Sequence, residues 1–216
     1  MTSDRSSVIP VGRRGRRGPN RLLVVFGIAM VPAGCARPVT ELRIQSFGSG
    51  EGPVDLYERF DEAYYSRDAR GSLDLVLRSI RPSRQDPSQI IRQTLHVNAF
   101  WTPMPGRTFV ESTQCNATLC YVIGTGPVAI SYEGAGFVTF SLNGFKRTMT
   151  GKIESGQLSP LRRIGQAKDL LGQAQITGQF RAKQDKNRVL ALLGELRREI
   201  GPAPPYTRPP DQRGPR

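Results

Sequence analysis

Residues 137–153 read FVTFSLNGFKRTMTGKI, and this stretch decides the fold class. Apolar and polar residues alternate on both sides of Asn143-Gly144, as in a half-buried strand. Asn-Gly between two alternating runs favours a type I′ turn, because both central residues must take positive φ. The sequence therefore predicts an antiparallel hairpin that pairs roughly 137–142 with 145–153.

Similar short strands, separated by turn residues, are predicted on either side of this hairpin. They are expected to begin at Leu73 and to cover 94–101, 108–114, 119–123, 128–132 and 173–183. Short strands with tight turns indicate an antiparallel meander, a sandwich or a partly open barrel. No alternation of strand and helix is visible, which argues against a doubly wound parallel sheet.

Two amphipathic helices are predicted to flank the sheet, so the expected class is α+β and β-rich. The first covers Val54–Tyr65, where apolar residues recur at helical spacing: Leu56, Phe60, Ala63 and Tyr64. The second covers Lys186–Ile200, with Asp185 as its N-cap and Gly201 at its end. Its apolar stripe should pack on the sheet and consists of Val189, Leu193, Leu196 and Ile200.

The N-terminal part of the chain has the features of a targeting signal. Residues 21–35 read RLLVVFGIAMVPAGC and follow a basic segment, 13–17. A basic region, a short apolar region and a small-residue exit are the parts of a secretory signal peptide. A membrane-spanning helix needs about 20 apolar residues. The shorter run here contains Pro32, so a permanent transmembrane helix is disfavoured.

The last residues of this stretch, Ala33-Gly34-Cys35, resemble the lipobox of bacterial lipoproteins. That family has Leu, Val or Ile three residues before the cysteine, where this chain has Pro32. The resemblance covers the first 35 residues. It implies that residues 1–34 are removed and that Cys35 is lipidated. The protein would then be exported and anchored in the bilayer on the periplasmic or outer cell surface. The alternatives are a plain secretory signal with an incidental cysteine and a buried apolar helix.

The expected organisation has four parts. A signal peptide (1–34) precedes the lipidated cysteine and a Gly-rich flexible tether (35–53). One β-rich domain (54–200) follows, and the chain ends in a tail (201–216) with six prolines in sixteen residues, expected to be extended and disordered.

Charge limits the range of partners. The first 34 residues hold six Arg and one Asp, so the chain's 31 basic and 18 acidic residues leave 25 and 17, a net charge of +8. An exported basic protein can bind anionic envelope polymers or envelope proteins. No basic stripe is interleaved with aromatic residues, and the export signal also argues against nucleic acid. The sequence leaves the oligomeric state open.

With Cys35 lipidated, Cys115 and Cys120 remain as a pair. In one continuous strand, residues five apart point to opposite faces and cannot bond. If 116–119 form a hairpin loop instead, the two cysteines face each other and can form a disulfide in an oxidising compartment. Two reduced, packed thiols are the alternative.

Motifs for chemistry are few. The chain has one histidine, His96, and no CxxC, HExxH, GxSxG or P-loop spacing, so neither a metal site nor a cofactor site is predicted. A hydrolase would have to use His96 or a pair of carboxylates among Asp61, Glu62, Glu111 and Glu133. The leading hypothesis is a non-enzymatic, lipid-anchored binding module of the cell envelope. An envelope structural or assembly factor and a small hydrolase are the alternatives.

Overall fold

The computed structural model describes residues 40–47, 52–69, 71–83, 86–101 and 115–201. The chain divides into two compact units, Met1–Cys35 and Ala36–Arg216, and every described residue belongs to the second. The signal peptide, Cys35, the predicted strand 108–114 and the Pro-rich tail after Gly201 lie outside the described residues.

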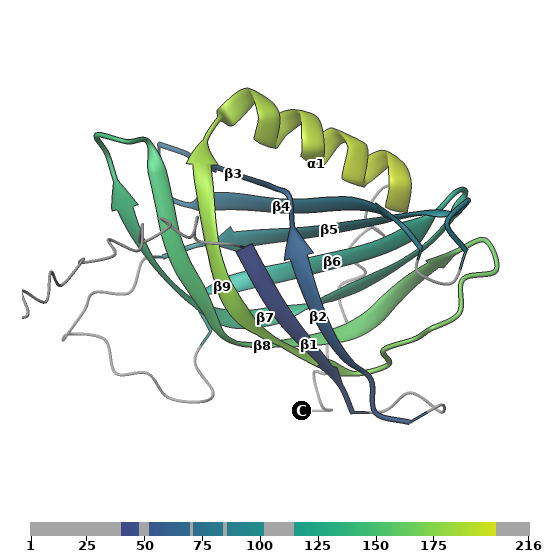
Figure 1. Ribbon diagram of the computed structural model, residues 1–216. Helices are drawn as coiled ribbons and strands as arrows, with labels where there is room; N and C mark the ends of the chain where they lie inside the picture. Colours follow the sequence, from purple (N-terminus) through teal and green to yellow (C-terminus); the bar gives the residue numbers. More distant parts are fainter. Residues whose placement is uncertain (1–39, 48–51, 70, 84–85, 102–114, 202–216) are drawn as a thin grey trace, which may run out of the picture. The chain divides into compact units, whose positions relative to one another are not determined.

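The described residues form nine strands and one helix (Figure 1). In chain order these are β1 (Thr40–Ser46), β2 (Asp55–Phe60), β3 (Glu62–Arg67), β4 (Leu73–Pro82), β5 (Ile90–Ala99), β6 (Ala117–Thr125), β7 (Val128–Asn143), β8 (Thr148–Ile164), β9 (Ala174–Gln184) and α1 (Lys186–Ile200).

Strands β3 to β9 close into a seven-stranded barrel. From β3 to β8, each strand pairs antiparallel with the next strand in the chain, which is a meander. Strand β8 then pairs antiparallel with β9. A short parallel ladder between β3 and β9 completes the ring, through Tyr64↔Lys183 and Tyr65↔Gln184. The β1–β2 hairpin continues the sheet from β9, antiparallel throughout. The predicted β-rich, mainly antiparallel class is confirmed.

The hairpin predicted at Asn143 is confirmed, but its turn is longer than type I′. Strands β7 and β8 pair from Asn143↔Thr148 onward, so four residues connect them. The Asn143 side chain accepts a hydrogen bond from the Lys146 backbone N–H at 3.0 Å, and the positive φ falls on Arg147. An Asx-type bond of this kind stabilises a wider turn than the two-residue one expected.

The helix predicted over Val54–Tyr65 is wrong, because these residues form β2 and β3. Leu56, Phe60 and Tyr64 are four residues apart, and a spacing of four satisfies a two-residue repeat as well as a helical one. The backbone bends at Asp61, where its N–H donates to the Arg78 carbonyl at 3.1 Å.

Two segments expected to be irregular are strands. The predicted tether contains β1, whose Leu42 and Ile44 are fully buried in the core. The Gly-rich segment 133–136, expected as a turn, lies inside β7 and joins two predicted strands into one. A Cβ on Gly134 would come within 1.7 Å of the Gln157 carbonyl oxygen, so glycine is needed there for strand contact and not for a turn.

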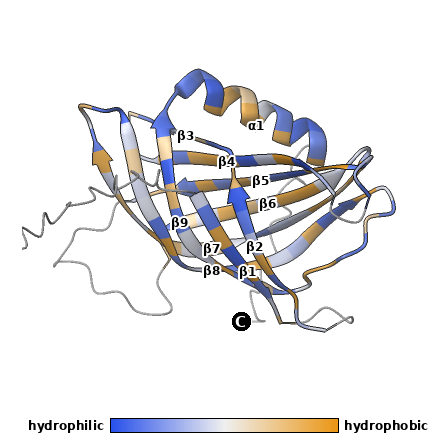
Figure 2. Ribbon diagram, viewed as in Figure 1, coloured by the Kyte–Doolittle hydropathy of each residue, from blue (hydrophilic) through white to orange (hydrophobic). Residues whose placement is uncertain are grey.

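The barrel interior is packed with side chains from alternate positions of each strand, and the alternation is visible along the ribbons in Figure 2. Its largest fully buried members include Leu75, Leu95, Tyr121, Tyr132 and Met149. Burying a side chain of this size contributes about 1.5–3 kcal/mol, so this interior is the main source of stability.

The C-terminal helix matches its predicted bounds and packs on the outer face of the barrel. Asp185 caps it, accepting from the Arg188 N–H at 2.9 Å. Val189, Leu192 and Leu196 are its buried residues, whereas Leu193 and Ile200 of the predicted stripe are partly buried.

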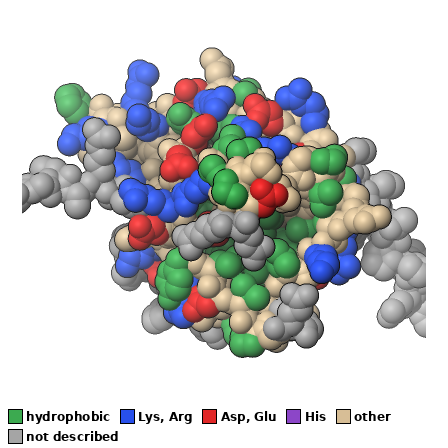
Figure 3. Space-filling view, turned by 45° about the vertical axis from the view of Figure 1, so that its right-hand side comes forward, with side chains coloured by type: hydrophobic (Ala, Val, Ile, Leu, Met, Phe, Trp, Pro, Cys, Tyr) green, Lys and Arg blue, Asp and Glu red, His purple; other side chains and the backbone are tan. Residues whose placement is uncertain are grey.

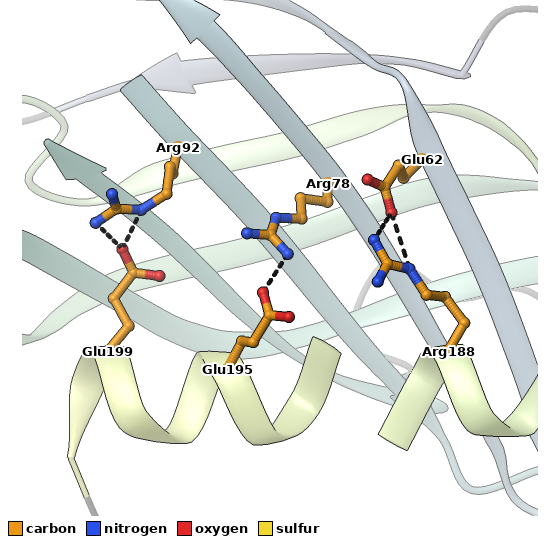
Figure 4. Close-up of polar contacts among 6 residues, drawn as sticks. All are labelled: Glu62, Arg78, Arg92, Arg188, Glu195 and Glu199. Carbon is orange, nitrogen blue, oxygen red and sulfur yellow. Dashed lines mark hydrogen bonds and ion pairs between the residues drawn. The ribbon is translucent and has the colours of Figure 1, made fainter. Parts of the chain in front are cut away.

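Three ion pairs flank this apolar contact (Figure 4). They join the helix to three different strands and are Arg188–Glu62, Glu195–Arg78 and Glu199–Arg92. Partly exposed pairs of this kind contribute about 0–1 kcal/mol each, so they set the helix register more than its affinity for the sheet.

The first prediction concerns Gly178 of β9, which lies opposite Leu42 of β1 in the antiparallel ladder. Its φ is +148°, and an added Cβ would lie 2.3 Å from the Glu41 carbonyl oxygen. We expect Gly178→Ala to lower the free energy of unfolding by about 3 kcal/mol, measured by urea denaturation. Gly144→Ala is the control, because nothing lies within 4 Å of its added Cβ, and it should be near neutral. Equal effects of the two changes would contradict this account of the close contact between β9 and β1.

Candidate functional site

The candidate site is a notch where strand β9 changes neighbour. One edge of β9 pairs with β1 as far as Gln179 and with β3 from Lys183. Between these two positions the edge of β9 has no strand partner among the described residues. The change follows from the bend at Asp61, which carries the chain from the β1 side of β9 to β4.

The Thr40 side chain provides hydrogen bonds to the backbone of Arg181, which has no partner on this edge among the described strands. Its hydroxyl donates to the Arg181 carbonyl at 3.4 Å and accepts from the Arg181 N–H at 3.2 Å. Thr40 is buried, so its side chain plugs the gap while the Arg181 side chain remains exposed above it. The backbone at the base of the notch therefore has its hydrogen bonds, and the charged side chains around it are free to face solvent.

The notch has a volume of about 680 Å³ and a polar lining. Its charged residues come from β2, from the bend, from β3 and from β9, and they are Arg59, Asp61, Glu62, Arg181 and Lys183. The Thr148 side chain, from the start of β8, also contributes to the wall.

Both carboxylates of the notch already have basic partners from outside it. Glu62 accepts from the Arg188 guanidinium at 2.7 and 3.2 Å, and this hydrogen bond raises the pKa of Arg188 above its usual value. Asp61 lies 3.6 Å from Arg81. The three basic side chains of the notch, by contrast, make no ion pair within the described chain. The notch therefore presents uncompensated positive charge.

This concentration of one sign is local. On the face shown in Figure 3, basic and acidic side chains are intermingled around a group of hydrophobic ones. A mixed surface of this kind keeps a protein soluble but attracts no particular ion. The notch differs because its acids are neutralised and its cations are not.

His96 lies outside the notch, on the outer face of β5. Its Nε2 lies 2.9 Å from Asp74 Oδ1, and the Asn98 amide donates to the same oxygen at 2.9 Å. The hydrogen bond from His96 is the largest cause that holds the pKa of Asp74 below its usual value, with Asn98 and Arg197 of the helix adding to it. The structure thus gives His96 a carboxylate partner that sequence reasoning did not identify.

Cys120 is the nearest nucleophile to His96 in the sheet register, but its surroundings oppose activation. The two residues are directly opposite each other on β5 and β6. Burial, followed by the charge of Glu133, raises the pKa of the Cys120 thiol to about 12. A reactive cysteine requires a lowered pKa. Of the candidate carboxylates, Asp61 and Glu62 both line the notch, where each has a basic partner, and Glu133 lies on β7. Glu111 lies outside the described residues.

The hairpin loop that a disulfide between the two cysteines would require is absent. Residues 117–120 are part of β6, and Asn116 is buried before it with its amide bound to the Val138 backbone at 2.7 and 2.8 Å. Cys115 is an exposed free thiol and Cys120 a half-buried one. The geometric condition for the proposed disulfide, a hairpin loop over 116–119, is therefore not met.

Two further findings concern sites and membranes. Across the described ranges, no three Cys, His, Asp or Glu side chains are grouped closely enough to hold a metal ion. None of the helices in those ranges has the length and apolar character needed to cross a bilayer.

Comparison of the chain with models of protein families, with curated proteins and with solved structures gives no match. The candidate site therefore has to be judged on its own geometry.

Of the charged notch residues, Asp61 and Glu62 were singled out from sequence as candidate carboxylates, whereas Arg59, Arg181 and Lys183 were not. Arg181 and Lys183 alternate with buried Phe180 and Ala182, which read as an ordinary solvent-facing side of a strand. Only the change of strand partner shows that this side faces a gap, and no local pattern encodes that change.

The second prediction concerns acid stability. Because the folded pKa of Asp74 is depressed, its contribution is complete above the unfolded pKa of about 3.9 and is lost as pH falls through the lower folded value. We expect Asp74→Asn to be less stable than the wild type at pH 6, and this difference to shrink below about pH 4. Denaturation curves at pH 3 to 6 measure both. A difference that stays constant with pH would contradict the assignment.

Proposed function

We propose that this protein is an exported, membrane-anchored lipoprotein whose barrel is a non-enzymatic binding module of the cell envelope. Its ligand would be an anionic envelope component, a phosphate-bearing polymer or headgroup, held at the notch. Anchoring rests on the lipobox-like Ala33-Gly34-Cys35, and the binding function rests on the notch.

The observation that carries the binding function is the charge imbalance at the notch. Arg181 and Lys183 project from β9 beside two carboxylates that are already engaged by Arg188 and Arg81. An anion entering the notch therefore meets unpaired cations without having to displace an existing ion pair. Hydrogen bonds to charged groups contribute about 1.5–3 kcal/mol each, so two such contacts give measurable affinity.

A second candidate function, a structural or assembly role in the envelope, is favoured by a different feature. Within the described residues, one edge of strand β2 has no strand partner, and protein partners commonly add a strand to such an edge. Both functions are compatible with one tethered barrel.

The third prediction tests the notch. With inorganic polyphosphate as the probe and the full chain in mild detergent, we expect Arg181→Ala/Lys183→Ala to weaken binding by about tenfold or more. The matched control is Arg67→Ala/Lys168→Ala, which removes the same charge from exposed positions outside the notch. If the two double variants weaken binding equally, the protein attracts anions by net charge alone and the notch is not the site.

The fourth prediction tests the anchor. In cells supplied with labelled palmitate, we expect the wild-type chain and Cys115→Ser to carry the label and Cys35→Ser to lose it. Mass spectrometry of the mature protein should place the lipid on an N-terminal Cys35. Retention of the label by Cys35→Ser, or a mature N-terminus elsewhere, would contradict lipidation at this residue.

A further inference from the structure

Strand β2 is the end of the sheet. The strand order is β2-β1-β9-β3-β4-β5-β6-β7-β8, with an additional β8–β9 pairing. Among the described strands, β2 is therefore the one with no strand partner along an entire edge. Figure 1 shows β2 beside β1. Tyr57, in the middle of β2, is 71% exposed. Exposed strand edges template pairing with another strand unless the sequence prevents it.

The register identifies which backbone groups of β2 face outward. Ser46 N–H donates to the Val54 carbonyl at 2.8 Å, which makes Ser46↔Val54 a hydrogen-bonded pair. Such pairs alternate along an antiparallel ladder. Leu56, Glu58 and Phe60 therefore direct their N–H and C=O groups to β1, and the groups of Asp55, Tyr57 and Arg59 point to the unpaired edge.

The side chains at this edge are self-complementary. Asp55 and Arg59 lie two residues before and after Tyr57, on the outer face of the sheet. In an antiparallel pairing of two β2 strands centred on Tyr57, each Asp55 lies opposite Arg59 of the second copy. The two tyrosines face each other at the two-fold axis. Opposite charges directly across a ladder are stabilising, and like charges are destabilising.

The neighbouring strand extends the same charge pattern. On β1, Glu41 lies opposite Arg59 and Arg43 lies opposite Tyr57. Arg43 also pairs with Asp55 at 2.6 Å and stacks on the Tyr57 ring at 5.3 Å. Across the paired edge, the order would be Glu41, Arg59, then Asp55 of the second copy, which that copy's Arg43 reaches diagonally from the position opposite Tyr57. Each charge would therefore lie beside one of opposite sign.

We propose that β2 pairs antiparallel with β2 of a second copy of this chain, centred on Tyr57, to form a two-fold symmetric dimer with one continuous sheet. The three outward-facing residues of each strand supply both the backbone hydrogen bonds and the charge match. The inference does not depend on anion binding at the notch. Its tests change Arg59, which also lines the notch, but leave Arg181 and Lys183 unchanged.

The interface is small, which determines where dimers should form. Stable interfaces bury more than about 1,000 Å² in total, and pairing of two six-residue strands provides less. Association is therefore weak for chains diluted in solution. Chains confined to one surface or micelle meet at a high effective concentration, which favours the dimer.

Cysteine cross-linking tests the register. The full chain with Cys115→Ser and Cys120→Ala, in mild detergent, serves as background and as the control without an edge thiol. We expect oxidation to cross-link Tyr57→Cys into a dimer, because residue 57 lies opposite itself. Neither Asp55→Cys nor Arg59→Cys should cross-link alone. Residue 55 of one copy lies opposite residue 59 of the other, so two identical thiols are separated by four residues along the strand. A mixture of these two variants should form the cross-linked heterodimer.

Charge reversal tests the recognition. In the Tyr57→Cys chain, Arg59→Asp places two carboxylates face to face and should reduce the cross-linking rate by about tenfold, whereas Arg59→Lys should largely retain it. Two results would overturn the proposal. One is equal cross-linking of all three edge-cysteine variants, which indicates random collision. The other is no cross-link at residue 57 under conditions in which urea denaturation shows the variant to be folded.

Discussion

The structure depends on how strand β9 divides one of its edges between two partners. Its first half pairs with β1, and its last two residues pair with β3 in the parallel sense. The parallel ladder is what closes the barrel. Because β2 and β3 are joined by the single residue Asp61, the chain cannot serve both partners without bending there. The bend leaves the notch on one side and the unpaired β2 edge on the other, so both candidate surfaces have the same origin.

The helix covers part of the outer face of the barrel. Val189, Leu192 and Leu196 are buried against the barrel, and each contributes about 1.5–3 kcal/mol. The three ion pairs beside them contribute less in energy, but each reaches a different strand. Apolar burial thus holds the helix in place and the charges determine its register. The helix packs beside the surface that contains His96, Cys120 and Asp74 and partly covers it.

Sequence reasoning succeeded where the signal is local and periodic. The hairpin at Asn143 and the capped helix from Lys186 follow from short patterns whose physical causes act within a few residues. The strands β2 and β3 were missed because a four-residue spacing fits both periods. The class and the meander were therefore predictable, whereas the closure between β3 and β9 was not, since no local feature encodes a parallel pairing over two residues. The notch depends on that closure and was missed with it.

The charged residues on β2 can affect pairing between copies in two ways. Charges on an edge strand usually prevent pairing between copies. Here they restrict it to one register. Sliding one copy so that Asp55 faces its own equivalent pairs two acids, and sliding it the other way pairs two Arg59 side chains. Only the arrangement centred on Tyr57 joins opposite charges at both sites. The same residues that oppose irregular aggregation of an otherwise closed barrel therefore permit one symmetric contact.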